Sequence, residues 1–343
     1  TKEVPLAPSA LPIRTFTNDP VQARAMSKSE IRDLRRWFVN AAKRSKEAGF
    51  DLICLYGAHG FGIFQHFLSR ATNQRSDEYG GSLENRSRFA REVVADMRDA
   101  VGDTMALTMR VSLDETIGEL GFSNAELRDF IEMNRDLPDL WDLAQGTWED
   151  CSGPSRFKDE AAQETLVRGI HELSDKPIVG VGRFTSPDAM VSQIKRGVLD
   201  LIGAARPSIA DPFLPNKIDT GRHDDIRECI GCNACTAEVM TYSRIRCTQN
   251  PSAGEEQHGG EEERAAKRHP RIVREPASWG AGSSTSAICR GYPITSAARR
   301  VSRAAGFGVA VRGASAPPPP READGSRTRS HRRGCRPRAG RTP

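Results

Sequence analysis

Residues 177–203 read PIVGVGRFTSPDAMVSQIKRGVLDLIG, and this stretch predicts a strand, a helix and a second strand in succession. The apolar runs at 177–181 and 199–203 have the length and composition of buried strands. Between them Ser186 supplies a helix N-cap, Pro187 occupies the first helical position, and a glycine ends the helix. A unit of this kind indicates two parallel strands joined by a right-handed crossover.

The same alternation of strands and helices runs back towards the start of the chain. Capping boxes support it at Ser27 and Ser123, each with a glutamate three residues later. Five strands alternating with helices predict an α/β fold with a parallel sheet. A doubly wound sheet would give the same pattern, and a (β/α)8 TIM barrel needs eight strands, of which five are visible. The predicted helices begin at residues 27, 84, 123, 160 and 186, and the predicted strands span residues 51–56, 105–111, 140–144, 177–181 and 199–203.

Composition separates the end of the chain from the rest. Residues 265–343 carry seventeen Lys or Arg and three Asp or Glu, so the remainder is acidic although the whole chain has a formal net charge of +5. The positive charge therefore belongs to the tail and is no argument for nucleic-acid binding. Residues 258–343 are rich in Arg, Ser, Gly, Ala and Pro and lack periodicity, which predicts a disordered segment.

Residues 1–26 are rich in proline and show no clear strand, so they are predicted to be an irregular N-terminal segment. The sequence contains no apolar run long enough to cross a membrane and does not open with a charged and then apolar leader. A cytoplasmic protein without a membrane partner is therefore expected.

Four of the eight cysteines give the strongest signal in the sequence. Cys229, Cys232 and Cys235 fall within seven residues, and Cys247 follows further along the chain. Three thiolates at this spacing can occupy three corners of a compact cubane, with the fourth corner supplied by the returning chain. Residues 221–257 are therefore predicted to form a [4Fe–4S] loop. Zinc, which more often takes two separated pairs of ligands, and unligated thiols are the alternatives.

Several longer motifs accompany the cysteine loop, in the order YGAH at 56–59, DEYGGSLENR at 77–86, GPSRF at 153–157, GVGR at 180–183 and ARPSIADPF at 205–213. Together they make residues 28–256 resemble the amine dehydrogenase branch (trimethylamine, dimethylamine and histamine dehydrogenases) of the flavin-dependent old yellow enzyme class. The resemblance implies that residues 27–220 are part of an FMN-binding (β/α)8 TIM barrel that lacks its first three strands.

The implied reaction is oxidative dealkylation of a small alkylamine, with electrons passing from FMN through the [4Fe–4S] cluster to an electron-transfer flavoprotein. A homodimer is a further expected assembly. Enoate and 2,4-dienoyl-CoA reductases of the same class share the DEYGGS and cysteine motifs, so an NAD(P)H-dependent reductase is the main alternative. A metal-stabilised interaction module and an inactive fragment are the others. A barrel without three strands is expected to be catalytically incompetent, because it has open edges and an uncovered interior.

The resemblance assigns the substrate site to four residues. Tyr56 and His59 match the tyrosine and histidine of the amine dehydrogenase site, and Asp150 is taken as the carboxylate that completes it. A carboxylate partner orients an imidazole for proton transfer. Trp148 matches a tryptophan of the family's substrate site, where aromatic faces hold an alkylammonium by cation–π attraction. Apart from the motif, a lone histidine or tryptophan is more often a structural residue.

A second set of five residues is implied to bind the flavin. Arg206 stands where the family binds the flavin phosphate, and the loops after the last two strands are phosphate sites in many barrel enzymes. Gly182, Arg183 and Ala205 belong to the same predicted cradle. Arg110 resembles the arginine that lies against the flavin ring. The structural alternatives are a surface salt bridge for Arg206 and a buried ion pair for Arg110.

Overall fold

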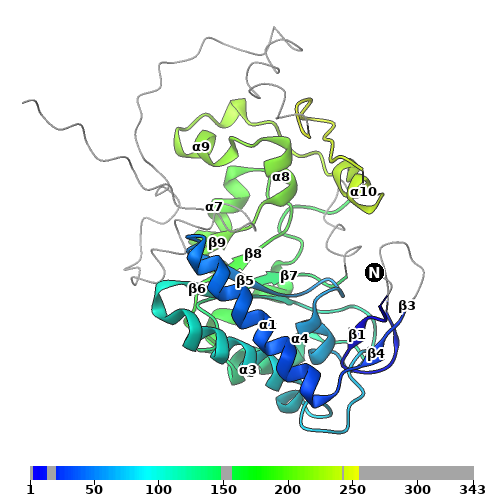
Figure 1. Cartoon of the computed structure of the whole chain (residues 1–343). Coiled ribbons are helices and arrows are strands. Elements are labelled where there is room, and N and C mark those ends of the chain that lie inside the picture. The colour runs from blue at the N-terminus through cyan, green and yellow to red at the C-terminus, as the bar shows by residue number, and fades with distance from the viewer. Residues whose placement is uncertain (1–2, 14–20, 148–156, 242, 255–343) are drawn as a thin grey trace, which may run out of the picture. The chain divides into compact units, whose positions relative to one another are not determined.

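The computed structural model describes residues 3–13, 21–147, 157–241 and 243–254 (Figure 1). Its main sheet has five parallel strands, and neighbours in the sheet are also neighbours in the chain. This sequential order is the order of a βα barrel, whereas the strand order of a doubly wound sheet reverses at a switch point. The strands are β5 (Leu52–Gly57), β6 (Ala106–Ser112), β7 (Leu140–Ala144), β8 (Ile178–Gly180) and β9 (Leu201–Ile202).

The longer helices begin at serine N-caps whose hydroxyl accepts a hydrogen bond from the backbone. They are α1 (Lys28–Glu47), α3 (Leu83–Val101), α4 (Asn124–Met133) and α7 (Pro187–Lys195). In α1 and α4 the third residue is a glutamate that bonds back to the cap, which confirms the predicted capping boxes. The shorter helices are α2 (Ile63–Leu68), α8 (Ala205–Ala210), α9 (Leu214–Asp219) and α10 (Ala234–Met240). None of the described helices is long and apolar enough to cross a membrane.

The two faces of the sheet differ in chemistry because successive side chains of a strand point to opposite sides. On one face Leu107, Met109 and Val111 of β6 are fully buried in the main core, which also holds Phe89 of α3. On the other face β6 carries Arg110. A small apolar cluster closes that second face at the amino ends of the strands, made of Leu52, Ala106, Leu140, Val179 and Leu201. The polar side chains of this second face therefore lie towards the carboxyl ends of the strands.

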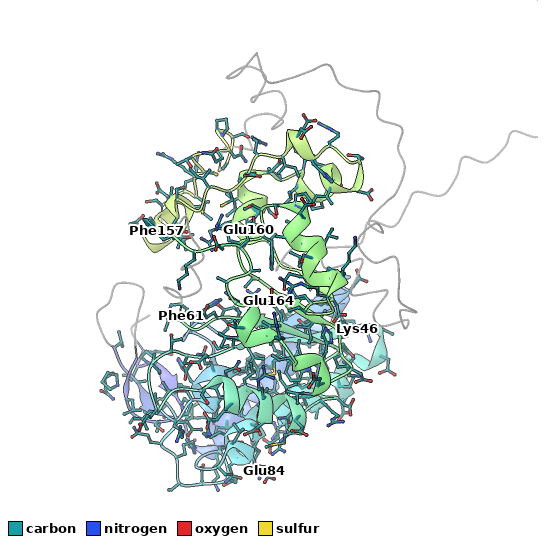
Figure 2. The ribbon with its side chains drawn as sticks, turned by 180° about the vertical axis from the view of Figure 1, so that it is seen from behind. Lys46, Phe61, Glu84, Phe157, Glu160 and Glu164 are labelled. Carbon is teal, nitrogen blue, oxygen red and sulfur yellow. The ribbon has the colours of Figure 1, made fainter. Side chains whose placement is uncertain are left out.

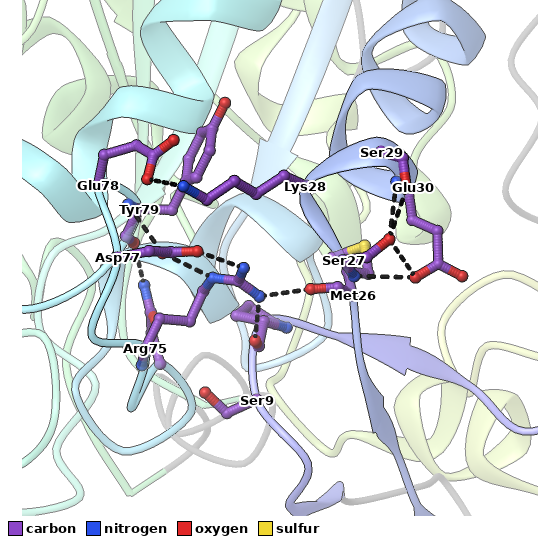
Figure 3. A network of polar contacts seen from close by, with 12 residues as sticks. Ser9, Met26, Ser27, Lys28, Ser29, Glu30, Arg75, Asp77, Glu78 and Tyr79 are labelled. Carbon is purple, nitrogen blue, oxygen red and sulfur yellow. Dashed lines mark hydrogen bonds and ion pairs between the residues drawn. The ribbon is translucent and has the colours of Figure 1, made fainter.

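Arg75 ties the N-terminal segment to the barrel (Figure 3). Its guanidinium donates to the carbonyl oxygens of Pro8 at 2.9 Å and Met26 at 2.6 Å. Asp77, the first residue of the DEYGGS motif, holds this guanidinium through two hydrogen bonds of 3.0 Å and 2.6 Å. The segment that was predicted to lack strands contains four of two residues each, β1 (Leu6–Ala7), β2 (Pro12–Ile13), β3 (Val21–Gln22) and β4 (Arg24–Ala25). Through Arg75, Asp77 of the DEYGGS motif therefore stabilises the contact between the N-terminal segment and the barrel.

The prediction of a single helix over residues 160–174 is wrong. Only α6 (Glu164–Val167) and a 3-10 turn, η2 (Ile170–Glu172), form there, because Gly169 adopts a left-handed φ of 82° between them. Glu160 precedes α6 (Figure 2) and accepts hydrogen bonds from the backbone of Thr185 at 2.7 Å and Ser186 at 2.9 Å. Its carboxylate therefore caps the start of α7. The tail predicted to be disordered lies outside the described residues.

Candidate active site and cysteine loop

The chain segments that follow β5, β6 and β7 meet at the carboxyl ends of these strands. Beyond the last regular strand pair, His59 forms a parallel bridge with Thr147. The N–H of His59 donates to Ser112 Oγ at 3.4 Å, and Ser112 Oγ donates to the Gly146 carbonyl at 3.3 Å. These contacts bind three loops into one unit at the edge of the sheet where barrel enzymes carry their active sites.

Tyr56 and His59 form a pair at this edge, as their motif implied. The Tyr56 hydroxyl and His59 Nδ1 are hydrogen-bonded, and the centres of the two rings lie 5.8 Å apart. The imidazole is 5% exposed, whereas Tyr56 is 36% exposed. Burial lowers the pKa of His59 to about 4, and the charge of Arg110 adds to the effect. At neutral pH the imidazole is therefore uncharged and can accept a proton.

Arg110 forms a two-point ion pair with Asp142 across the sheet. The register of β6 and β7 places the two residues opposite one another. Arg110 Nε lies 2.8 Å from Asp142 Oδ2, and Arg110 Nη2 lies 3.1 Å from Asp142 Oδ1. Burial raises the pKa of Asp142, and Arg110 opposes that rise. The sequence analysis missed Asp142, although a carboxylate inside the apolar run LWDLA at 140–144 is the signal that could have identified it.

The ends of β8 and β9 bring together the residues predicted to hold the flavin phosphate. A Cβ on Gly182 would lie 3.0 Å from the Ala161 backbone, so this position favours glycine. Arg183 donates to the carbonyl oxygens of Lys158 at 3.0 Å and Cys229 at 3.2 Å. Arg183 Nε is buried and has no hydrogen-bond partner among the described residues. Ala205 begins α8.

Arg206 lies at the wall of a hollow formed by the cysteine loop. Arg206 Nη1 donates to Asn233 Oδ1 at 2.5 Å. The hollow is small and partly open to solvent. Sequence analysis placed Arg206 at the flavin phosphate, and the structure places it beside the thiols. The four predicted ligands line this hollow together, namely Cys229, Cys232, Cys235 and Cys247.

Backbone conformation lets the cysteine loop curl around the hollow. Gly231 and Asn233 both have left-handed φ angles, of 64° and 59°. Glycine adopts left-handed φ angles without strain, which the loop requires at Gly231, and asparagine at position 233 tolerates them better than most residues. Burial raises the pKa of the Cys229 and Cys235 thiols, and the positive charge of Arg206 works in the opposite direction. Backbone N–H groups also reach the sulfurs, since Gln249 N donates to Cys247 Sγ at 3.4 Å.

No three Cys, His, Asp or Glu side chains in the described part of the chain are arranged to hold a single metal ion. Trp148 and Asp150, the two remaining predicted site residues, lie outside the described residues. Thr147, which pairs with His59, is the last described residue before them.

Comparison with known families agrees with this geometry. Residues 1–225 match the model of the NADH:flavin oxidoreductase / NADH oxidase family. The chain belongs to this family. The barrel-type α/β fold predicted from the sequence is thereby confirmed, and the family is one of flavin enzymes.

Individual relatives of the chain include amine enzymes. The chain is 46% identical over 237 residues to dimethylamine dehydrogenase of Hyphomicrobium sp. (strain x), covering 67% of this chain and 32% of that protein. The solved structure of histamine dehydrogenase from Rhizobium sp. 4-9 is 80% identical with a TM-score of 0.72, covering 74% of this chain and 37% of that one. The solved structure of 6-hydroxypseudooxynicotine amine oxidase from Pseudomonas geniculata N1 is 55% identical with a TM-score of 0.72, and the match covers 75% of this chain and 39% of that one. The chain thus spans about a third of the length of these relatives, and the likeness supports the amine dehydrogenase branch.

Proposed function

We propose that this member of the family is an FMN- and iron–sulfur-dependent enzyme that oxidises a small alkylamine. The observation that carries the proposal is the Tyr56–His59 pair. An uncharged, buried imidazole is hydrogen-bonded there to a half-exposed phenol at the active-site edge of a barrel. The names of the amine-oxidising relatives support the same chemistry.

His59 is the proton acceptor in this proposal. Because its pKa lies well below neutrality, the imidazole is in the unprotonated form that an acceptor needs, although a pKa of about 4 makes it a weak base. Tyr56 is the more exposed of the two residues, so its hydroxyl is the group that an incoming amine would meet first. Asp150 as a carboxylate partner and Trp148 as a cation–π surface stay predictions.

Arg110 is proposed to face the flavin ring. It projects from the polar face of the sheet, and Asp142 fixes the guanidinium in one orientation through two hydrogen bonds. Bound FMN supplies the acceptor for the electrons of the amine. A fixed positive charge at that place favours binding of an electron-rich ring.

The phosphate of FMN is proposed to lie at the ends of β8 and β9, between Gly182, Arg183 and Ala205. The buried Arg183 Nε, which has no partner among the described residues, is a donor that an anion would satisfy. The short helix α8 follows the last strand in the manner of barrel phosphate sites. Arg206 is proposed to contribute its charge from the cysteine side.

The cysteine hollow is proposed to hold a [4Fe–4S] cluster through Cys229, Cys232, Cys235 and Cys247. Four thiols that line one hollow suit a cluster, whose thiolates bind different iron atoms. When bound, the cluster supplies one-electron transfer to a partner. An electron-transfer flavoprotein as that partner, a homodimer and a cytoplasmic location remain parts of the proposal.

The test uses anaerobic reconstitution with FMN, iron and sulfide. It is applied to the 343-residue chain and to the same chain extended by the N-terminal segment of the Rhizobium enzyme. Dimethylamine or histamine should bleach the flavin of the extended chain, and His59→Asn should slow bleaching on the order of a hundredfold. The matched control is His223→Asn, since His223 is exposed and far from Tyr56 in sequence. Bleaching by NADH but by no amine would favour the enoate reductase alternative.

The cluster has its own assay. Iron and sulfide should each approach about four per chain, and Cys232→Ala should lower both. Stoichiometric zinc, or an iron content that Cys232→Ala leaves unchanged, would refute the cluster.

A further inference from the structure

The turn that carries His59 is conformationally strained. His59 has a φ of 62° and the next residue, Gly60, has a φ of 73°. Glycine adopts this left-handed region freely, but for a residue with a Cβ it is unfavourable by about 1 kcal/mol or more. Such a conformation persists only where the surroundings determine it. Something other than the intrinsic preference of histidine must therefore hold this turn.

Gln65 of α2 holds the turn from one side. Its side chain is 1% exposed, and its Oε1 accepts a hydrogen bond from Gly60 N at 2.8 Å. Its Nε2 donates to Glu115 Oε1 at 2.7 Å. The preceding N–H, of His59, is held by Ser112 Oγ. Two successive N–H groups in the strained turn are therefore both bonded to side chains from other elements.

Glu115 fixes the orientation of the Gln65 amide. Its carboxylate is 5% exposed, lies in the loop after β6, and accepts a second hydrogen bond from Phe122 N at 2.6 Å. A carboxylate can only accept, so the Gln65 NH₂ must face Glu115 and the Gln65 oxygen must face Gly60. The reverse orientation would put two donors opposite each other at Gly60 and two acceptors opposite each other at Glu115.

We infer that Glu115 and Gln65 form a positioning relay, which holds the left-handed turn at His59 and so keeps its imidazole in contact with Tyr56. Gln65 acts on the turn through the backbone N–H of Gly60 and Glu115 acts through Gln65, so both are positioning residues and not catalytic ones. The relay belongs to the site of the proposed function, and it rests on that function only for the role of His59 in amine oxidation.

The relay can be broken and rebuilt without changing its size. In Glu115→Gln the new amide has one accepting oxygen, which can take the hydrogen bond from Gln65 Nε2 or from Phe122 N but not both, so one hydrogen bond of the relay is lost. Gln65→Glu places two carboxylates about 2.7 Å apart. The double variant Gln65→Glu/Glu115→Gln restores each bond, because the new carboxylate accepts from Gly60 N and from the new amide, whose oxygen accepts from Phe122 N.

The experiment measures the His59 imidazole directly by NMR titration of the cofactor-free full chain. The signal is assigned by its loss in His59→Asn. In Glu115→Gln and in Gln65→Glu the His59 pKa should rise from about 4 towards 6.5 as the ring leaves its buried place, and it should return to about 4 in the double variant. In the reconstituted enzyme the single variants should slow amine-dependent bleaching on the order of ten- to a hundredfold, and the double variant should recover it.

Two results would overturn the relay. One is a His59 titration that the single variants leave unchanged. The other is a double variant that stays as perturbed, or as unfolded, as the single ones although its hydrogen bonds are complete. If the titrations follow the expected pattern while no amine bleaches flavin in any variant, the relay stands and the proposed function fails.

Discussion

The chain should lose stability as the pH falls from neutral to about 4, and replacing His59 by asparagine should make that loss smaller. The pKa of His59 in the folded chain is about 4, below its ordinary value of 6.5, because the ring is buried and Arg110 is near. Between these two values the unfolded chain binds a proton that the folded chain does not bind. Stability must therefore fall as the pH falls through this window, and below about pH 4 this residue adds no further change.

The size of the effect follows from the same two values. Each pKa unit between folded and unfolded states corresponds to ~1.4 kcal/mol. The interval from 6.5 to about 4 therefore gives up to about 3 kcal/mol of unfolding free energy that is present at pH 7 and absent at low pH. This is a large share of the ~5–15 kcal/mol that stabilises an ordinary domain.

The assay is urea denaturation of the cofactor-free chain at several pH values. It can be followed by the fluorescence of Trp141, which is fully buried in the main core. The difference in unfolding free energy between pH 7 and pH 4 should be about 3 kcal/mol smaller in His59→Asn than in the wild-type chain. His223→Asn, which leaves His59 in place, should keep the wild-type difference. Equal pH dependence in His59→Asn and wild type would refute the buried, uncharged imidazole.

Three further substitutions test the packing around the site and the start of the barrel. Gly62→Ala places a Cβ 2.2 Å from the Tyr56 carbonyl oxygen, so it should lower the unfolding free energy by about 1–3 kcal/mol and disturb the Tyr56 loop; thermal melting as in wild type would contradict this. Asp142→Leu leaves the charge of Arg110 without its carboxylate partner and should lower the unfolding free energy by ~3–5 kcal/mol. Adding Arg110→Met should restore most of that loss, and denaturant titration measures both values. Ser27→Ala removes the N-cap of α1 and should destabilise by ~1 kcal/mol, and no change in melting temperature would show that the capping box contributes nothing.

Local sequence signals predicted the regular elements well where the chain obeys local rules. The cap at Ser27 and the proline at position 187 mark helix starts that the structure confirms, because an N-cap satisfies its own backbone N–H groups within one turn. The five predicted strands all form, although β9 is shorter than its apolar run. The prediction failed at residues 160–174, where Glu160 bonds to the start of α7 and Gly169 breaks the helix. Competing contacts from distant residues decided that segment.

The cysteine loop lies between these cases. Spacing alone predicted that Cys229, Cys232 and Cys235 lie close together, since they are neighbours in the chain. Cys247 was predicted as the fourth member of the set, and it lines the same hollow, whereas the place of Arg206 in its wall required the folded chain. Local patterns could not predict the contact of Arg206 with Asn233, because 27 residues separate the two in the chain.

The sequence by itself determined the order of strands and helices, the motif residues and the family. The order of the elements depends on periodicity and caps, which act over a few residues, and the family resemblance rests on the motifs. Only the tertiary structure decided which side chains form the site. The register of β6 and β7 brings Asp142 to Arg110 across 32 residues, and loop packing brings Glu115 to Gln65 across 50. The same packing removes His59 from water and so sets its protonation, because desolvation depends on everything that surrounds a group and on nothing in its local sequence.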